Sequence, residues 1–303
     1  MKVAAAVCPE APAVTRTRVA DYVQLCKPRL TIMSLLTVAA GAILAAGGGT
    51  LPWSILLHTL VGAAFVAAGA SACNQFLERD YDALMRRTKN RPLPAGRLQP
   101  AEVLCFGTAT GIGGVLYLSL ALPQPLAAIL AALTFASYVF VYTPLKRVTS
   151  LNTLIGAIPG ALPPVIGWTA VRGSLDLEIG TLFLILFLWQ VPHFLAIAWL
   201  YRDDYRRAGM HMLPVVDRDG SISSLQMIAY CLALIPASLT PLFVGRAGVI
   251  YMTGALVLGS CFIGFTIAFA RERSLQRARG VLRASLIYLP VLLALLLLDG
   301  VAP

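Results

Sequence analysis

Long stretches of the chain carry no charged side chain at all, and this restricts the fold more than any other feature. Forty-eight consecutive residues separate Arg29 from Glu78. A helix needs about 20 apolar residues to cross the hydrocarbon layer of a bilayer, so this interval predicts two spans joined by the Gly- and Pro-containing turn at residues 47–52. The interval between Glu102 and Lys146 predicts two more spans, joined by a turn at residues 122–125.

Single spans are expected at about 148–171, 179–201, 223–245, 248–270 and 282–298, which gives nine in all. Only 15 residues separate Arg283 from Asp299, so the last span requires Arg283 to extend its charge to the headgroups. Charged residues make up 13% of the chain, about half the usual share in a soluble domain. The sequence therefore predicts an all-α polytopic membrane protein, with an N-terminal tail at residues 1–26 and a single intramembrane domain at residues 27–303.

Basic residues divide unevenly between the two ends of these spans. With nine spans, 22 of the 24 Lys and Arg residues lie on one side, and only Arg172 and Arg246 lie on the other. The positive-inside rule makes the rich side, including the N-terminus, cytoplasmic. This topology accounts for much of the net charge of +10, so the charge does not indicate nucleic-acid binding. The lack of an Arg- and Ser-rich presequence favours a bacterial inner membrane over a mitochondrial one.

Three polar residues recur every four positions at the end of the second span. Asn74, Glu78 and Asp82 lie on one stripe of a helix if the span continues through them. Carboxylate and amide oxygens at this spacing suit a hard cation such as Mg²⁺, which shares its coordination with phosphate oxygens. The simpler interpretation is a solvated helix end whose acids pair with neighbouring arginines.

Basic residues follow this stripe directly, in the run MRRTKNRPLP at residues 85–94 and at Arg97. Such cations could clamp a diphosphate group, or they could form an ordinary positive-inside cluster. The segment at residues 201–214 repeats the order of acid, basic pair and Leu-Pro, with Asp203 and Asp204 at the end of the sixth span.

These segments resemble the signature motifs of the UbiA superfamily of intramembrane prenyltransferases. The first resemblance lies in the run NQFLERDYD at residues 74–82, followed by RTKNRPL at 87–93. Four further runs resemble the branch whose members farnesylate haem B: YTPLKR at 142–147, PPVIGW at 163–168, WQVPHF at 189–194, and Asp204-Tyr205 leading to MLPVV at 212–216. The resemblance covers nearly the whole chain, from about Lys27 to the last span.

The resemblance implies nine helices around a central cavity that opens sideways to lipid, and a Mg²⁺-dependent enzyme. The implied reaction joins the farnesyl group of farnesyl diphosphate to a vinyl group of haem B (protoheme IX) with addition of water, giving haem O and diphosphate. Haem B is then a substrate and not a cofactor. The implied partners are these two substrates, the lipid bilayer, and a haem A synthase or the assembly machinery of a terminal oxidase.

Site residues follow from the matched motifs. Asn74, Glu78 and Asp82 match the first metal-diphosphate motif, and Asp204 matches the acid of the second. Members that prenylate aromatic acceptors usually place two Asp four residues apart in the second motif, whereas position 200 is Leu here. This departure favours haem over a quinone precursor. Diphosphate contacts are expected first from Lys89, Arg91 and Arg97, and then from Lys146 and Arg147.

His193 lies about two turns inside the sixth span and belongs to one of the matched runs. It could ligate haem iron, hydrogen-bond a propionate or shuttle a proton, and its simpler interpretation is a packing residue. Pro159, Pro163 and Pro164 predict an irregular fifth span that lines the cavity.

Three other functions fit part of the pattern. A transporter would also use nine spans and a broken helix, but this chain has few charges in the middle of its spans. An assembly factor that hands haem to an oxidase would not need the acids. A UbiA-type prenyltransferase acting on a quinone precursor or another aromatic acceptor is opposed only by the departure in the second motif.

Overall fold

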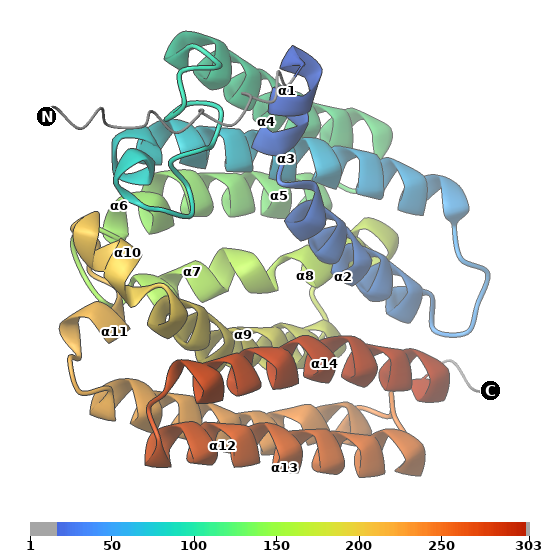
Figure 1. Cartoon of the computed structure of the whole chain (residues 1–303). Helices are drawn as coiled ribbons and strands as arrows, with labels where there is room; N and C mark the ends of the chain where they lie inside the picture. Colours follow the sequence, from blue (N-terminus) through green and yellow to red (C-terminus); the bar gives the residue numbers. More distant parts are fainter. Residues whose placement is uncertain (1–16, 301–303) are drawn as a thin grey trace, which may run out of the picture.

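The computed structural model describes residues 17–300, and the elements it contains over that range are all helical. Figure 1 shows them in chain order. The elements are α1 (Arg18–Leu25), α2 (Pro28–Ala46), α3 (Trp53–Leu84), α4 (Pro100–Ala121), α5 (Leu126–Ala136), the π-helical segment η1 (Ser137–Tyr142), α6 (Thr143–Leu145), α7 (Asn152–Ala161), α8 (Pro163–Arg172), α9 (Leu177–Leu200), α10 (Arg202–Arg207), α11 (Leu213–Val216), α12 (Ser221–Phe243), α13 (Val249–Arg271) and α14 (Leu275–Gly300).

Nine helical segments between residues 17 and 300 are long and apolar enough to cross a membrane. They are α2, α3, α4, α5 through α6, α7 through α8, α9, α12, α13 and α14. The predicted nine-span all-α fold is therefore confirmed. The last span is longer than expected, 25 residues from Leu275 to Asp299. Arg277, Arg279 and Arg283 lie in its first turns, and arginine sustains a helix while its charge reaches water.

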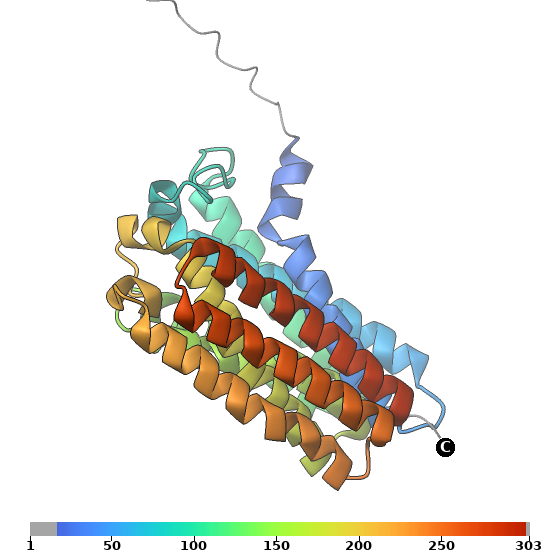
Figure 2. The same ribbon diagram turned by 60° about the horizontal axis from the view of Figure 1, so that its bottom comes forward.

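The spans lie side by side, and the short elements gather at one end of the bundle. Figures 1 and 2 show α6, α10 and α11 at the end where α3 terminates, whereas the turn between α2 and α3 lies at the opposite end. Along the bundle α3 packs on α4, α2 packs on α8, and α9 packs on α12 and α14. We call the end that holds α6, α10 and the last turn of α3 the charged end.

Apolar side chains cover the outside of the bundle as well as its core. Leu120 is 88% exposed and Phe243 is 86% exposed, while Trp168, Tyr251 and Phe262 are fully buried. A soluble monomer rarely exposes a large apolar surface, but lipid chains solvate one readily. The protein is a multi-pass integral membrane protein.

The fourth and fifth spans depart from regular α-helix. The fifth breaks at Leu162, between α7 and α8, with Pro159 inside α7 and Pro163 at the start of α8. This irregularity was predicted from the prolines. The π-helical turn of the fourth span, Ser137–Tyr142, was not predicted, because the segment itself contains no proline or glycine and Pro144 follows only two residues after its end. Such turns are frequent at functional sites, and this one leads directly into the charged end.

The helix α1 belongs to the segment that we assigned to the N-terminal tail, of which residues 1–16 lie outside the described part. Its last residue, Leu25, is buried, and the Leu25 carbonyl accepts hydrogen bonds from Ser71 Oγ at 2.7 Å and from Gln75 Nε2 at 2.9 Å. Both donors are on α3. Residues 18–25 are therefore packed onto the intramembrane bundle, and they fix where the chain enters the first span.

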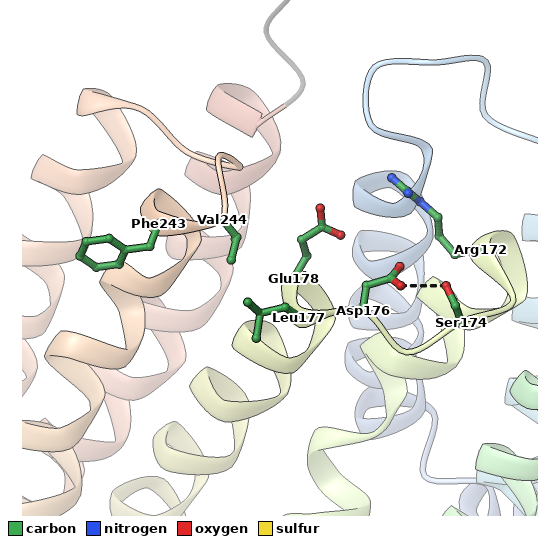
Figure 3. A pocket seen from close by; sticks show the side chains of 7 residues that line it. All are labelled: Arg172, Ser174, Asp176, Leu177, Glu178, Phe243 and Val244. Carbon is green, nitrogen blue, oxygen red and sulfur yellow. Dashed lines mark hydrogen bonds between the residues drawn. The ribbon is translucent and has the colours of Figure 1, made fainter.

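The opposite end of the bundle holds the two arginines that the sequence separated from all other cations. An open pocket of about 690 Å³ lies there, lined by Arg172, Ser174, Asp176, Leu177, Glu178, Phe243 and Val244 (Figure 3). Arg172 Nε donates to the Ala45 carbonyl at 2.8 Å, at the end of α2, and Arg246 pairs with Glu178 at 3.2 Å. Both cations are thus held by groups of the bundle itself.

Backbone contacts between α2 and α8 depend on two glycines. A Cβ atom at Gly41 would overlap the Pro164 carbonyl, and a Cβ at Gly167 would overlap the Val38 carbonyl. Small residues that let helix backbones approach are the usual basis of tight packing inside membranes. This contact joins the first span to the broken fifth span.

We expect Gly167→Ala to destabilise the protein. The added methyl group meets backbone atoms that cannot rotate away, and overpacking of this kind costs about 1–3 kcal/mol. Gly264→Ala is the matched control, since nothing lies within 4 Å of a Cβ there. Thermal unfolding of both variants in detergent checks this, and equal unfolding temperatures would contradict the tight contact.

Candidate active site

The last turns of α3 carry the polar stripe predicted from the sequence. The helix continues to Leu84, so Asn74, Glu78 and Asp82 share one face. All three are buried, with exposed fractions of 1%, 4% and 0%. Two carboxylates buried this deeply require compensating charge. They are not a solvated helix end.

Each residue of the stripe has a basic partner from a different segment. Arg91 Nη1 lies 2.5 Å from Asp82 Oδ2, and Lys146 Nζ lies 2.7 Å from Glu78 Oε1. Lys27 Nζ donates to Asn74 Oδ1 at 3.1 Å. The partners come from the loop after α3, the end of the fourth span and the start of the first. The site is therefore an assembly of three segments on α3.

The stripe has an oxygen atom that is still free to bind a cation. The Asp82 Oδ1 atom is buried and has no hydrogen-bond partner among the described residues. Buried polar atoms without partners are rare in folded proteins, and they usually mark a place where water, an ion or a substrate binds. Carboxylate and amide oxygens are the ligands of hard divalent cations. The donor set of Asn74, Glu78 and Asp82 thus fits Mg²⁺.

Lys146 is held from several sides. Its ammonium lies 4.5 Å from the ring centre of Tyr142, and its carbonyl accepts a hydrogen bond from His211 N at 2.7 Å. Burial opposes the charge, but the Glu78 carboxylate outweighs burial and raises the pKa of Lys146 above its ordinary value. Lys146 is thus a permanent cation beside Glu78.

Lys27 was counted in the sequence only as a topology charge, and the structure brings it to the stripe. Its backbone has φ of 45°, a left-handed conformation that is uncommon for a residue with a side chain. Burial, with the positive charges of Arg91 and Lys146 nearby, lowers the pKa of the Lys27 ammonium to about 7. In the sequence, the feature that could have indicated this placement is that Lys27 comes directly before Pro28, the first residue of the first span.

Arg147 lies against the same helix but contacts different groups. Its Nη2 donates to the Leu77 carbonyl at 2.6 Å, and its guanidinium lies 4.0 Å from the ring centre of Tyr81. Thr143, one turn earlier, accepts a hydrogen bond from Asn74 Nδ2 at 3.1 Å. Sequence reasoning missed Thr143, although it lies in the matched run at residues 142–147.

Asp204 lies on α10 and is linked to the loop after α3. It pairs with Arg207, and its Oδ2 accepts a hydrogen bond from the Arg87 backbone N–H at 3.2 Å. Asp203, the neighbouring acid, is exposed and pairs with Arg206. No group of three His, Cys, Asp or Glu side chains that could hold a metal occurs between residues 17 and 299. Asp204 therefore does not form a three-carboxylate group with Glu78 and Asp82 in this structure.

The remaining predicted diphosphate residues lie further out. Arg97 pairs with Asp21 of α1 at 2.8 Å and also donates to Gln24. Lys89 is exposed on the loop. Of the five basic residues expected at the diphosphate, the structure brings Arg91 and Lys146 to the buried acids, places Arg147 beside them, and directs Arg97 to the N-terminal helix.

His193 lies on α9, within the sixth span. Its Nδ1 is 2.8 Å from Ser285 Oγ of α14, and its ring stacks on Trp189 with a centroid distance of 4.9 Å. About seven residues separate it from the end of α9, which is roughly 10 Å along a helix. His193 thus lies within the sixth span, and its hydrogen bond joins α9 to α14.

Comparison with known proteins gives one consistent result. The chain matches the family model described as "UbiA prenyltransferase family" over residues 34–293. It is 47% identical over 287 residues to the "Protoheme IX farnesyltransferase" of Solibacter usitatus (strain Ellin6076), covering 92% of this chain and 98% of that protein.

Solved structures share the fold at low identity. A structure described as a digeranylgeranylglyceryl phosphate synthase matches with a TM-score of 0.78 and 18% identity, covering 94% of this chain and 99% of the other. A UbiA homologue from Archaeoglobus fulgidus bound to GPP and Mg²⁺ matches with a TM-score of 0.60 and 15% identity, covering 91% and 99%. By sequence and by fold, the chain belongs to the UbiA prenyltransferase family.

Proposed function

We propose that the protein transfers the farnesyl group of farnesyl diphosphate to a vinyl group of haem B, with addition of water, giving haem O and diphosphate. The observation that carries the proposal is the buried stripe of Asn74, Glu78 and Asp82 facing basic groups from three segments. The haem acceptor is supported by the protoheme IX farnesyltransferase relative, which aligns over nearly its whole length.

The proposed cofactor is Mg²⁺, held by Asn74, Glu78 and Asp82. Asp204 of the second acidic element, which is not grouped with them in this structure, would join them once the ion and the diphosphate are bound. The unpartnered Asp82 Oδ1 atom supports this assignment, and the Archaeoglobus homologue contains Mg²⁺ together with a prenyl diphosphate. When bound, the ion would neutralise the charge that develops on the leaving diphosphate. Its ligands here are hard oxygen donors throughout.

Basic groups around the stripe bind and orient the diphosphate in this proposal. Arg91 offers a planar fork, and Lys146 and Lys27 offer point charges. Each of the three is bonded to an oxygen of the stripe in this structure. We place Lys89, Arg97 and Arg147 as outer contributors, because Lys89 is exposed, Arg97 pairs with Asp21 and Arg147 donates to the Leu77 carbonyl.

We infer that the charged end faces the cytoplasm of a bacterial cell and that the protein lies in its inner membrane. The placement of most basic residues at that end supports this orientation. Haem O would then pass to a haem A synthase or to the assembly of a terminal oxidase. Proximity labelling in cells tests this partner assignment separately from the reaction.

The first experiment is incubation of the purified protein in detergent with haem B, farnesyl diphosphate and Mg²⁺, followed by mass spectrometry of the extracted porphyrins. We expect a product heavier than haem B by one farnesyl group and the elements of water, and we expect EDTA to abolish it. A folded preparation that instead prenylates a phenolic quinone precursor would replace the haem acceptor. Inactivity with both acceptors would favour a transporter.

We expect Asp82→Asn and Glu78→Gln each to lower turnover by about tenfold or more, as is usual when a metal ligand or its support is lost. Asp80→Asn is the matched control on the same helix, because the Asp80 side chain is 76% exposed. Steady-state rates at saturating substrates measure the effect. Wild-type rates in the two buried variants, with the fold intact, would remove the stripe from the mechanism.

We expect Arg91→Ala to raise the KM for farnesyl diphosphate about tenfold, since a charged hydrogen bond contributes about 1.5–3 kcal/mol. Arg97→Ala should change this KM far less, because Arg97 pairs with Asp21. Titration of farnesyl diphosphate at fixed haem B compares the two variants. If both variants raise the KM equally, Arg97 contacts the diphosphate as well. If Arg91→Ala leaves the KM unchanged, Arg91 does not contact the diphosphate.

A further inference from the structure

His193 and Ser285 form a polar pair between α9 and α14 that the proposed diphosphate chemistry does not use. Ser285 is buried, and the Trp189 indole N–H donates to the Ser285 backbone carbonyl at 2.9 Å. The Trp189 and His193 rings are stacked, with 24° between their planes. Two side chains one turn apart on α9 are thus fixed against one residue of α14.

The positions of the oxygen and nitrogen atoms determine which ring nitrogen carries the proton. Ser285 Oγ lies 2.7 Å from the Leu282 carbonyl oxygen and 2.8 Å from His193 Nδ1. Two oxygens at 2.7 Å need a proton between them, and the serine hydroxyl has only one to give. The hydrogen bond to His193 must then be donated by Nδ1–H. The neutral ring therefore carries its lone pair on Nε2.

A lone pair on Nε2 restricts what His193 can do. It cannot donate a hydrogen bond from Nε2 to a carboxylate while neutral. It can coordinate a metal or accept a proton. Among the residues from 17 to 299, the hydrogen bond of His193 runs through Nδ1 and not through Nε2.

The surroundings favour coordination over proton transfer. The ring contacts of His193 are with Trp189 and Phe194, at centroid distances of 4.9 and 5.5 Å. Its hydrogen-bond partner Ser285 is neutral. A charged imidazolium in such a setting would lack a counter-ion, which is costly away from water. Coordination of a metal leaves the imidazole neutral, and a hydrogen-bonded outer ring nitrogen is typical of ligating histidines.

We propose that His193 Nε2 is an axial ligand of the haem iron, and that Ser285 is a positioning residue that fixes the required tautomer. The proposal rests on the proposed function, in which haem B is the acceptor. Such ligation would hold the porphyrin against α9.

The test uses the full-length protein in detergent, titrated with ferric haem B and, in parallel, with metal-free protoporphyrin IX. We expect wild-type protein to give the optical and electron paramagnetic resonance signature of histidine-ligated iron. His193→Ala should lose that signature and bind haem at least about tenfold more weakly, and added imidazole should restore it. Binding of the metal-free porphyrin should be unchanged.

Variants of Ser285 show whether this serine fixes the tautomer of His193 or only fills space between α9 and α14. Ser285→Ala should weaken haem binding about tenfold, as loss of an outer-shell partner does, and Ser285→Thr should retain it. Controls are His58→Ala, whose ring bonds to Tyr117, and Ser238→Ala, a buried serine of α12 bonded to Tyr288. Neither control should alter the spectrum.

Two outcomes would overturn the assignment. A His193→Ala variant that keeps the histidine-ligated signature shows that another residue binds the iron. Equal weakening of metal-free porphyrin and haem shows that His193 contacts the macrocycle and not the metal. If wild-type protein makes haem O in either case, only this inference fails. If it neither binds haem nor makes haem O, the proposed function fails with it.

Discussion

Carboxylates buried at the end of a membrane-spanning helix need positive charge within bonding distance, and the charged end is organised by that need. Asp82 and Glu78 are compensated by Arg91 and Lys146, which lie in separate parts of the chain. Lys27 completes the arrangement from the start of the first span. In the proposed reaction the diphosphate would bind the cations while a divalent ion binds the acids, so that neither set would be left without a partner.

Irregular backbone in the fourth and fifth spans supports this assembly. The π-helical turn at Ser137–Tyr142 precedes Thr143 and Lys146, both of which contact the stripe. A Cβ at Gly156 of α7 would overlap the Tyr142 ring, so the fifth span holds that ring from behind. The His211 backbone N–H then ties the loop after α10 to Lys146. Both acidic elements are thereby connected through one lysine.

Two kinds of feature could be predicted from the sequence: those that follow a helical repeat, and those that lie between charged residues. Nine spans and the stripe of Asn74, Glu78 and Asp82 could be predicted, because one helical repeat and a series of uncharged intervals define them. Partners far apart in the sequence could not be predicted. The pairing of Arg97 with Asp21 and the approach of Lys27 to Asn74 depend on how α1 packs against α3, which no local pattern records. The π-helical turn was missed for the related reason that its sequence is an ordinary apolar run.

The position of His193 on α9 relates the proposed haem ligand to the charged end. Prenyl transfer occurs at the carbon next to the diphosphate, so the reacting vinyl group must reach the charged end. If His193 binds the haem iron as proposed, the iron would lie roughly 10 Å along α9 from the end of that helix. That end leads directly into α10, which carries Asp204. One helix would thus connect the residue that holds the acceptor with the second acidic element. The apolar interior of the bundle would keep water away from the reacting farnesyl carbon until the vinyl carbon has attacked.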